Sequence, residues 1–163
     1  LHQSMGIDPK GWRVLSDLRV EGAGGDLRYG RGLVDVTVSK GVGLLAAALT
    51  TSGGWTVGDV PVQRRFYLGG SQSIRGQTAL TGAGDAFWMT RAELGTSTAI
   101  ARPIIFFDAG WTGDRRSWNA QGRPLTGAGV GASFLDGVLR VDLSRGISPS
   151  KQTRLDVYLE ARF

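Results

Sequence analysis

The sequence predicts an all-β fold, an antiparallel transmembrane β-barrel of eight strands in meander order. Apolar and polar residues alternate with period two in eight segments, and helical periodicity is missing throughout. Each segment runs for about 9–12 residues, near the length that a tilted transmembrane strand needs and longer than the usual mode of about 5–6. Short turns and long loops alternate between the segments, which is typical of outer-membrane barrels. The predicted strands cover residues 11–22, 31–41, 43–51, 84–96, 99–110, 124–135, 137–147 and 153–163.

The first two predicted strands each have an apolar and a polar face. The apolar faces hold Trp12, Val14, Leu18, Val20, Val34, Val36 and Val38. The opposite faces hold Arg13, Asp17, Arg19, Glu21, Asp35, Thr37 and Ser39. In a transmembrane barrel the apolar face meets lipid and the polar face lines the lumen.

The last two predicted strands repeat this pattern most clearly. Their apolar face holds Leu139, Val141, Leu143, Leu155, Val157, Leu159 and Phe163. Their polar face holds Arg140, Asp142, Arg154, Asp156 and Glu160. We therefore expect the first set to contact lipid and the second set to face inward. Asp136-Gly137 and residues 146–152 predict short turns, whereas about 52–84 and 111–123 predict long loops.

The composition limits the chemistry of the protein. Glycine supplies 26 of 163 residues, about double its usual share of roughly 7%, which favours turns and strands. Cysteine is absent, so a disulfide scaffold and a thiolate metal site are excluded. The one histidine is His2 at the N-terminus, which argues against a histidine-based catalytic or zinc site. We expect no enzymatic activity, no catalytic residue, no metal and no cofactor.

The formal net charge is +5, and arginines lie beside acidic residues along the whole chain. This spacing favours a ladder of paired charges inside a barrel and argues against a nucleic-acid partner. No run of about 18 apolar residues predicts a transmembrane helix. The chain begins with Leu1 and has no visible signal peptide, so we expect it to be a piece of a longer exported protein.

The long connection at about 52–84 contains the most informative stretch, residues 64–77. It carries apolar residues and little charge beyond its arginines, so disorder is not predicted. The pair Gly69-Gly70 and the later Gly76 predict a tight backbone path that presents Arg75 to a specific acceptor. An ordinary glycine-rich hairpin loop with an exposed arginine is the alternative.

Successive residues of a strand face opposite sides of the sheet. This alternation places two carboxylates on the inward face of adjacent strands, Glu93 on the fourth and Asp108 on the fifth. Asp108 follows the apolar run 104–107, and a carboxylate in such surroundings needs a partner. Arg75 is the natural candidate, because its guanidinium has five donors and can hold two carboxylates.

These elements resemble the BamA/TamA family of outer-membrane assembly barrels, with its bacterial surface-antigen domain. Ile74-Arg75-Gly76 is similar to the tip of the family's lumen loop, and Ala92-Glu93-Leu94 to the strand with the acceptor glutamate. Residues 106–110 are similar to the strand with the acceptor aspartate. Phe163, with Leu155, Val157 and Leu159, resembles the C-terminal signal strand. Gln77 departs from the family's usual aromatic residue, and Ala161 from a larger one.

The resemblance implies that residues 1–163 are the C-terminal segment of a sixteen-stranded barrel in the bacterial outer membrane. It implies insertion or translocation of other proteins without covalent chemistry, by templating an incoming strand on an exposed strand edge. The expected partners are outer-membrane lipid, unfolded β-barrel client proteins, and either the missing N-terminal half-barrel with its periplasmic modules or another copy of the chain.

Two other interpretations stay open from the sequence. One is a passive barrel channel or membrane anchor, and the other is a soluble β-sandwich binding domain. Residues 127–131 alternate glycine with small residues but lack the lysine and helix of a phosphate loop, so we interpret them as room for a close neighbour. Four tryptophans lie near predicted strand ends, either as interfacial aromatic residues or as ordinary strand residues. They are Trp55, Trp88, Trp111 and Trp118.

Overall fold

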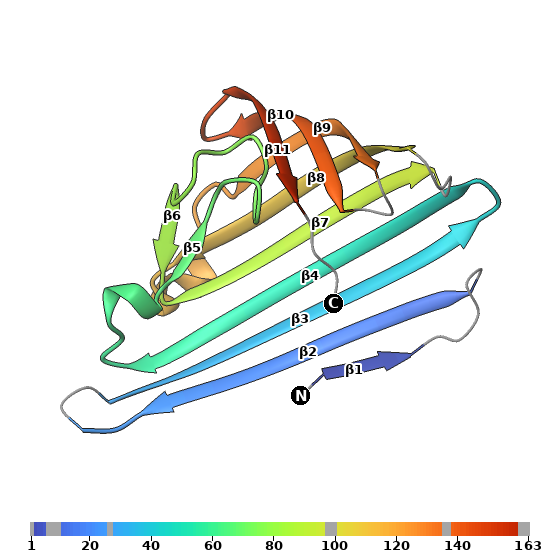
Figure 1. The fold of residues 1–163 in the computed structure, drawn as a ribbon. Helices are drawn as coiled ribbons and strands as arrows, with labels where there is room; N and C mark the ends of the chain where they lie inside the picture. The colour runs from blue at the N-terminus through green and yellow to red at the C-terminus, as the bar shows by residue number, and fades with distance from the viewer. Residues whose placement is uncertain (1, 6–10, 26–27, 97–100, 135–137, 160–163) are drawn as a thin grey trace.

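A computed structural model describes residues 2–5, 11–25, 28–96, 101–134 and 138–159. Nine strands form one antiparallel sheet in the order β1-β2-β3-β4-β7-β8-β9-β10-β11, and the sheet curves into an open trough (Figure 1). These strands are β1 His2–Met5, β2 Trp12–Ala23, β3 Tyr29–Val42, β4 Leu45–Gly58, β7 Ala86–Thr96, β8 Ala101–Gly113, β9 Leu125–Phe134, β10 Leu139–Ser148 and β11 Thr153–Leu159. Every pairing joins strands that are neighbours in this order.

The predicted fold class is confirmed, and the eight predicted strands correspond to β2, β3, β4, β7, β8, β9, β10 and β11. The short strand β1 was not predicted. Strand β4 also continues to Gly58, beyond the predicted end at residue 51. The glycines at 53 and 54 interrupt the apolar alternation of β4 there, but their backbone still pairs with β3 and β7. The loop therefore begins at residue 59, and Phe163 and the predicted turn at Asp136-Gly137 lie outside the described residues.

The two faces of the sheet have an inverted burial pattern. Apolar side chains on the outward face are exposed, with Val157 at 63% and Leu159 at 74%. Polar side chains on the inward face are buried, with Asp142 at 0% and Arg140 at 5%. A soluble β-sandwich packs the apolar face of one sheet against another sheet, and no second layer covers this face in the described part of the chain. The pattern is that of a barrel wall in lipid.

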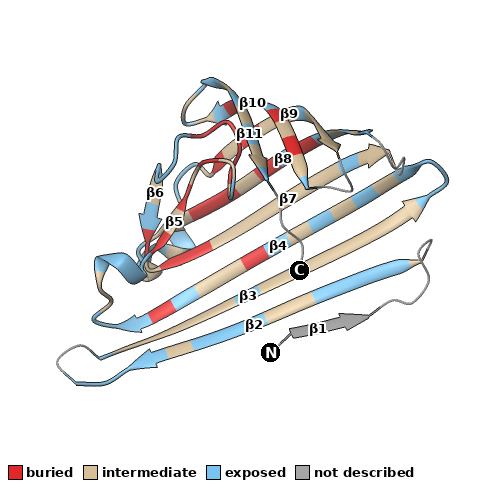
Figure 2. Cartoon of the chain, in the orientation of Figure 1, coloured by how far each residue is buried: buried red, intermediate tan, exposed pale blue. Residues whose placement is uncertain are grey.

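The connection between β4 and β7 folds back into the trough. It contains a short 3₁₀ helix, η1 Val62–Arg64, and a small hairpin of β5 Phe66–Leu68 and β6 Gly82–Gly84. Phe66, Leu68 and Ile74 from this connection form an apolar cluster with Phe87 and Leu125 of the wall. Figure 2 shows the buried residues concentrated where the connection meets β7 to β10. A second 3₁₀ helix, η2 Arg115–Ala120, lies between β8 and β9.

No helix within the described ranges is both long and apolar enough to cross a membrane.

Replacing Val157 by arginine should block assembly of the barrel, whereas Asp156→Asn in the same strand should have a mild effect. An arginine at the midplane of a lipid-facing surface costs about 2–4 kcal/mol, and asparagine keeps the size and hydrogen-bonding capacity of the inward aspartate. The measurement is the fraction of membrane-extracted protein that shows heat-modifiable migration. Equal losses in the two variants would contradict the assignment of the outward face to lipid.

Candidate functional site

The loop that runs from β5 to β6 has its tip at residues 69–77, and this tip lies on the inward face of the large sheet, which forms the wall of the trough. Gly69 and Gly76 have positive φ angles of 112° and 81°, which glycine adopts without steric cost. Gly76 also lies directly against the backbone of Arg145 and Gly146 at the end of β10. Ile74 beside it is fully buried in the apolar cluster. The tip therefore contacts the wall through its backbone, and this contact orients the side chain of Arg75.

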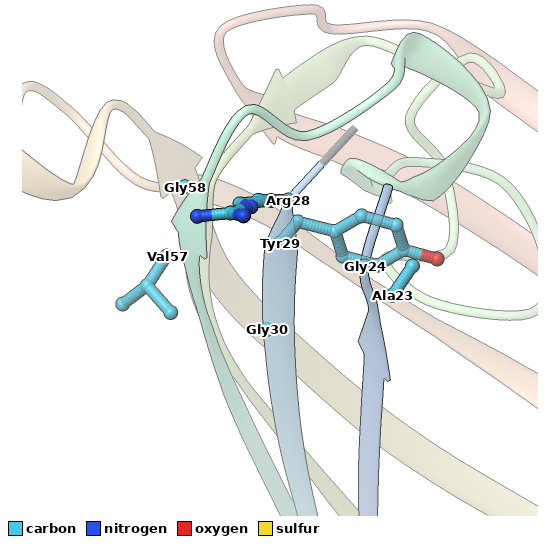
Figure 3. A pocket seen from close by; sticks show the side chains of 7 residues that line it. All are labelled: Ala23, Gly24, Arg28, Tyr29, Gly30, Val57 and Gly58. Atoms are coloured by element: carbon cyan, nitrogen blue, oxygen red, sulfur yellow. The ribbon is translucent and has the colours of Figure 1, made fainter. Parts of the chain in front are cut away.

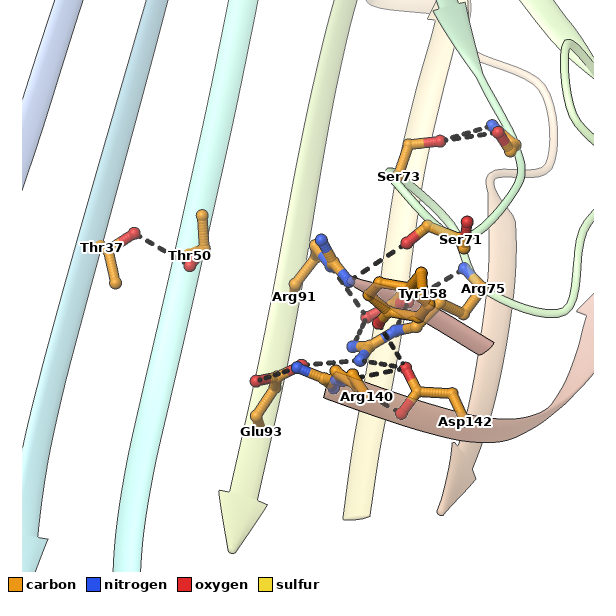
Figure 4. Close-up of polar contacts among 12 residues, drawn as sticks. Thr37, Thr50, Ser71, Ser73, Arg75, Arg91, Glu93, Arg140, Asp142 and Tyr158 are labelled. Atoms are coloured by element: carbon orange, nitrogen blue, oxygen red, sulfur yellow. Dashed lines mark hydrogen bonds and ion pairs between the residues drawn. The ribbon is translucent and has the colours of Figure 1, made fainter. Parts of the chain in front are cut away.

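Arg75 is fully buried and its guanidinium reaches carboxylates on three strands (Figure 4). Nε donates to Asp108 Oδ2 and Nη2 to Asp108 Oδ1, each at 2.6 Å, so the pair is bidentate. Nη1 donates to Glu93 Oε1 at 2.6 Å and lies 3.4 Å from Asp142 Oδ2. The guanidinium carbon lies 3.5 Å from the centre of the Phe106 ring, in cation–π geometry. Because the backbone N–H of Arg75 also donates to Asp108 Oδ2 at 3.0 Å, both its main chain and its side chain are held.

Two more arginines complete a charge network around this pair. Arg140 Nη2 donates to Glu93 Oε1 at 2.6 Å, and its Nε donates to Asp142 Oδ1 at 3.0 Å. Arg91 Nε lies 3.6 Å from Asp108 Oδ1. Three arginines thus face three carboxylates, so the network is electrically balanced. Charges inside a protein are stable only when they are paired in this way.

The charge state of Arg75 follows from this network. Burial lowers the pKa of the guanidinium, but its hydrogen bond to Asp108 and the charges of Asp108 and Glu93 raise it by more. The net effect is a pKa above the ordinary value for arginine, so Arg75 stays charged at any physiological pH.

The network also reaches the last described strand. Tyr158 on β11 donates its hydroxyl hydrogen bond to Asp142 Oδ2 at 2.7 Å. Asp142 therefore contacts Arg75 of the loop, Arg140 of its own strand and Tyr158 of the neighbouring strand. Loop docking and the position of β11 are consequently linked through one carboxylate.

Glycines on β9 make room for the loop tip. Gly127, Gly129 and Gly131 face the inside of the trough, and a Cβ on Gly127 would overlap the carbonyl oxygen of Arg75. A Cβ on Gly129 would lie 2.6 Å from Cζ of the Phe106 ring. On Gly131 it would overlap Asp142 Oδ1. The alternating glycines of 127–131 thus form a flat bed, on which the tip lies at Gly127 and the side chains of Phe106 and Asp142 lie at Gly129 and Gly131, in keeping with their interpretation as room for a close neighbour.

Gln77 holds the far side of the tip. Its side chain is fully buried, and Nε2 lies 2.8 Å from Thr126 O, 2.9 Å from Ser148 O and 3.1 Å from Ser150 O. These carbonyls belong to the start of β9 and the turn between β10 and β11. The amide therefore fastens the tip to backbone groups, a role that an aromatic side chain with no donor in this position would not fill.

The structure brings most of the predicted site residues together. Ile74, Arg75, Gly76, Glu93 and Asp108 meet at the tip, and Gly69 and Gly70 form its base. By contrast, the predicted signal residues Leu155, Val157 and Leu159 lie exposed on the outward face of β11. Phe163 lies outside the described residues. The functional role of all these residues stays a prediction.

Sequence reasoning did not assign four members of the network, Arg91, Arg140, Asp142 and Tyr158. Parity already placed Arg140 and Asp142 on the inward face, so a signal existed for their orientation. Their contacts with Glu93 and Arg75 join β10 to β7 and to the loop, which are not neighbours in the sheet. Only the curvature of the wall brings these groups within hydrogen-bonding distance.

No group of three or more histidine, aspartate or glutamate residues that could hold a metal ion occurs in the described ranges. A shallow hollow at the loop ends of β2, β3 and β4 is lined mainly by glycines and by Arg28, Tyr29 and Val57 (Figure 3). The Tyr29 hydroxyl donates to Glu21 Oε1 at 2.7 Å and is thereby occupied.

Replacing Arg75 by alanine should lower the free energy of unfolding by roughly 3–5 kcal/mol, because the buried Asp108 would lose its bidentate partner and keep only the longer 3.6 Å contact with Arg91. The measurement is the urea concentration at which heat-modifiable migration is lost. Arg64→Ala is the control, since Arg64 lies in the same connection but pairs with Glu21 in an exposed position, where an ion pair contributes little. Identical midpoints for the two variants would refute a central role for Arg75.

Replacing Gly127 by alanine should expel the loop tip, because the new methyl group would overlap the backbone of Arg75. Gly122→Ala is the matched control, since a Cβ there has no atom within 4 Å. Limited trypsin digestion of the folded protein measures the effect. Cleavage after Arg75 should appear in the Gly127 variant alone, and continued protection of Arg75 in that variant would contradict the proposed bed.

Comparison of the sequence with known protein families identifies the family to which the chain belongs. Residues 34–134 match the sequence model of the haemolysin secretion/activation proteins ShlB/FhaC/HecB, a stretch that runs from β3 to β9 and includes the loop tip. No curated protein matches the chain. The match supports an outer-membrane barrel of the wider superfamily of assembly and secretion barrels, a coarser statement than the BamA/TamA resemblance. Proteins of the matched family are outer-membrane secretion and translocation barrels, not known as enzymes. The chain belongs to the ShlB/FhaC/HecB family of outer-membrane β-barrel proteins for protein secretion and translocation.

Proposed function

We propose that this chain is the C-terminal half of a sixteen-stranded barrel, as in the BamA/TamA resemblance, and that it carries unfolded β-rich proteins through the outer membrane. The observation that carries the proposal is the docked loop tip, with Arg75 buried among Asp108, Glu93 and Asp142. No covalent step is required. The work is done by displacing a loop and offering polar surface and strand edges to an unfolded chain.

The docked tip lies where a polypeptide would have to pass. Its residues occupy the concave side of β7 to β10, which is the lumen side of the wall. An unfolded chain could enter only if the loop shifted, and it could then pair with the freed carboxylates and arginines of the wall. A network of short, charged hydrogen bonds suits a movable loop. The bonds are specific when the loop is docked, and water in the lumen solvates the charged groups when the loop is displaced.

Strand-edge templating is a second candidate function, and the position of β11 favours it. In the described strands β11 pairs with β10 alone, and β1 pairs with β2 alone, so the sheet has two open edges. An unpaired edge presents backbone donors and acceptors to an incoming strand. The partners proposed for these edges are an unfolded client protein, the N-terminal half-barrel, or another copy of the chain.

A passive channel or membrane anchor is the main alternative. The well-packed loop argues against a permanently open channel, because its apolar residues Phe66, Leu68 and Ile74 are buried against the wall. An anchor needs no buried charge network on its lumen face. Neither alternative accounts for the bidentate pair of Arg75 with Asp108.

The test combines reconstituted vesicles with a reversible lock on the loop. A Cβ on Gly82 would lie 2.7 Å from Thr112 Cγ2 of β8, so the double variant Gly82→Cys/Thr112→Cys should form a disulfide, and the chain has no other cysteine. The measurement is the amount of an unfolded β-rich client that becomes protected from protease inside the vesicles. We expect translocation to stop on oxidation and to return on reduction, with Gly82→Cys alone as the control.

Two results would contradict the proposal. Full translocation by the oxidised double variant would show that the loop does not have to move. Ion conductance without any client passage would identify a passive channel. Cross-linking of the client to a cysteine at Thr153 on β11, but not at Thr37 on β3, would distinguish edge templating from passage through the lumen.

A further inference from the structure

Four of the five tryptophans gather at one place on the outward face of the wall, at the loop ends of the strands. Trp55, Trp88 and Trp111 project outward from β4, β7 and β8, on the face opposite to Asp108 and Glu93. Trp118 of η2 completes the group. Its ring centre lies 5.4 Å from that of Trp55 and 5.6 Å from that of Trp111, both in edge-to-face geometry. We call these four residues the tryptophan cluster.

The cluster exists because η2 folds over the outside of the wall. Trp111 points outward and yet is only 6% exposed, since η2 covers it. Trp88 Nε1 donates to Gln121 Oε1 at 2.7 Å, and Arg115 Nη1 donates to Thr56 O at 2.9 Å. Asp114 begins η2 by accepting a hydrogen bond from Arg116 N at 2.8 Å. These bonds hold η2 in a fixed position against β4 and β7.

The cluster marks the boundary of the apolar band. From Leu45 to Trp55 along β4 there are ten residue steps, which at about 3.3 Å each and a tilt of about 40° span about 25 Å of membrane thickness. That matches the apolar band of an outer-membrane barrel. At the other end Trp12 lies under Lys40, with Nζ 4.8 Å from the ring centre. The tryptophan cluster and Trp12 therefore lie at the two opposite membrane–water interfaces, where tryptophan is enriched.

The segment that carries Trp118 also has unpaired positive charge. Arg116 and Arg123 are exposed, and neither forms an ion pair with a described residue. Arg115 uses its guanidinium on Thr56, and the Asp114 carboxylate accepts from the backbone of η2. Counting Asp114, Arg115, Arg116 and Arg123, the segment 114–123 has a net charge of +2. An anionic lipid has a charged headgroup and apolar acyl chains, so a segment that carries both positive charge and an amphipathic ring at the membrane surface suits it chemically.

We infer that the tryptophan cluster with Arg116 and Arg123 is a binding site for an anionic lipid of the outer-membrane surface. The two arginines hold the phosphate of the headgroup, and the exposed edges of Trp55 and Trp118 pack against the start of the acyl chains. The site is on the outside of the barrel, away from the loop tip, so it holds the wall at a defined depth and is independent of the proposed passage of clients.

Quenching by brominated lipids tests this inference. The reporter is the protein with Trp12→Phe, in which every remaining tryptophan belongs to the cluster. It is reconstituted into phosphatidylcholine vesicles that contain, at equal mole fraction, either phosphatidylglycerol or phosphatidylcholine with brominated acyl chains. The brominated anionic lipid should quench the tryptophan emission at least about twofold more strongly, because basic side chains near the surface concentrate anionic lipid.

Two double variants of the reporter decide the role of the arginines. Arg116→Gln/Arg123→Gln should bring the two quenching values together. Arg145→Gln/Lys151→Gln removes the same charge from exposed residues at the same end of the strands and should keep the difference. Equal quenching of the reporter by both lipids, or equal losses in both double variants, would overturn the inference. Absence of quenching by either lipid would show that protein covers the cluster, and would overturn it as well.

Discussion

The burial of one guanidinium group is the constraint on which the rest of the structure depends. Arg75 has no exposed surface, so its charge must be balanced entirely by protein groups. Asp108 does this in bidentate geometry, with Glu93 and Asp142 at the sides. These carboxylates come from β8, β7 and β10, so the loop tip can bind only when the three strands have the correct curvature. Docking of the loop therefore depends on the curvature of the wall, and the docked loop in turn stabilises that curvature.

The glycines of β9 are the geometric counterpart of this charge pairing. Short hydrogen bonds between the loop and two flanking strands require the backbone of the tip to approach the intervening strand closely. Any side chain at Gly127 would occupy the place of the Arg75 carbonyl. The stretch that resembles a phosphate loop in the sequence is therefore explained by packing alone. Three successive inward glycines on β9 make no apolar side-chain contacts, and the charge network is buried in the space that they leave.

The alternation of polar and apolar residues gives the wall two different faces, one toward the lumen and one toward lipid. Its inward face is polar, paired and buried under the loop, whereas its outward face is apolar and exposed to lipid. The tryptophan cluster lies where the outward face meets water, and η2 joins that boundary to the loop end of the strands. Tyr158 extends the inward network to β11 through Asp142. The loop tip and the last described strand are therefore linked through one carboxylate, whereas the tryptophan cluster lies on the opposite face of the wall.

The sequence by itself determined the strands and their faces, because alternation with period two is a local property of the chain. It also predicted the partnership of Arg75 with Glu93 and Asp108, because inward carboxylates in apolar surroundings need a cation and the loop arginine was the natural candidate. It did not determine the full length of β4, because Gly53 and Gly54 interrupt the apolar alternation although their backbone still pairs with β3 and β7. Nor did it separate the ShlB/FhaC/HecB family from the related assembly barrels, since both interpretations use the same loop and strand elements.

The tertiary structure alone decided the contacts between distant strands. Arg140 and Glu93 are separated in the sheet by β8 and β9, and they meet only because the wall curves. Gln77 binds three carbonyl groups that no sequence pattern marks, because backbone acceptors are the same in every residue. The tryptophan cluster likewise needs η2 to fold over the outer face. Alternation is set within a strand, but curvature is set by the packing of the whole sheet around the loop, and for that reason these contacts could not be predicted from the sequence.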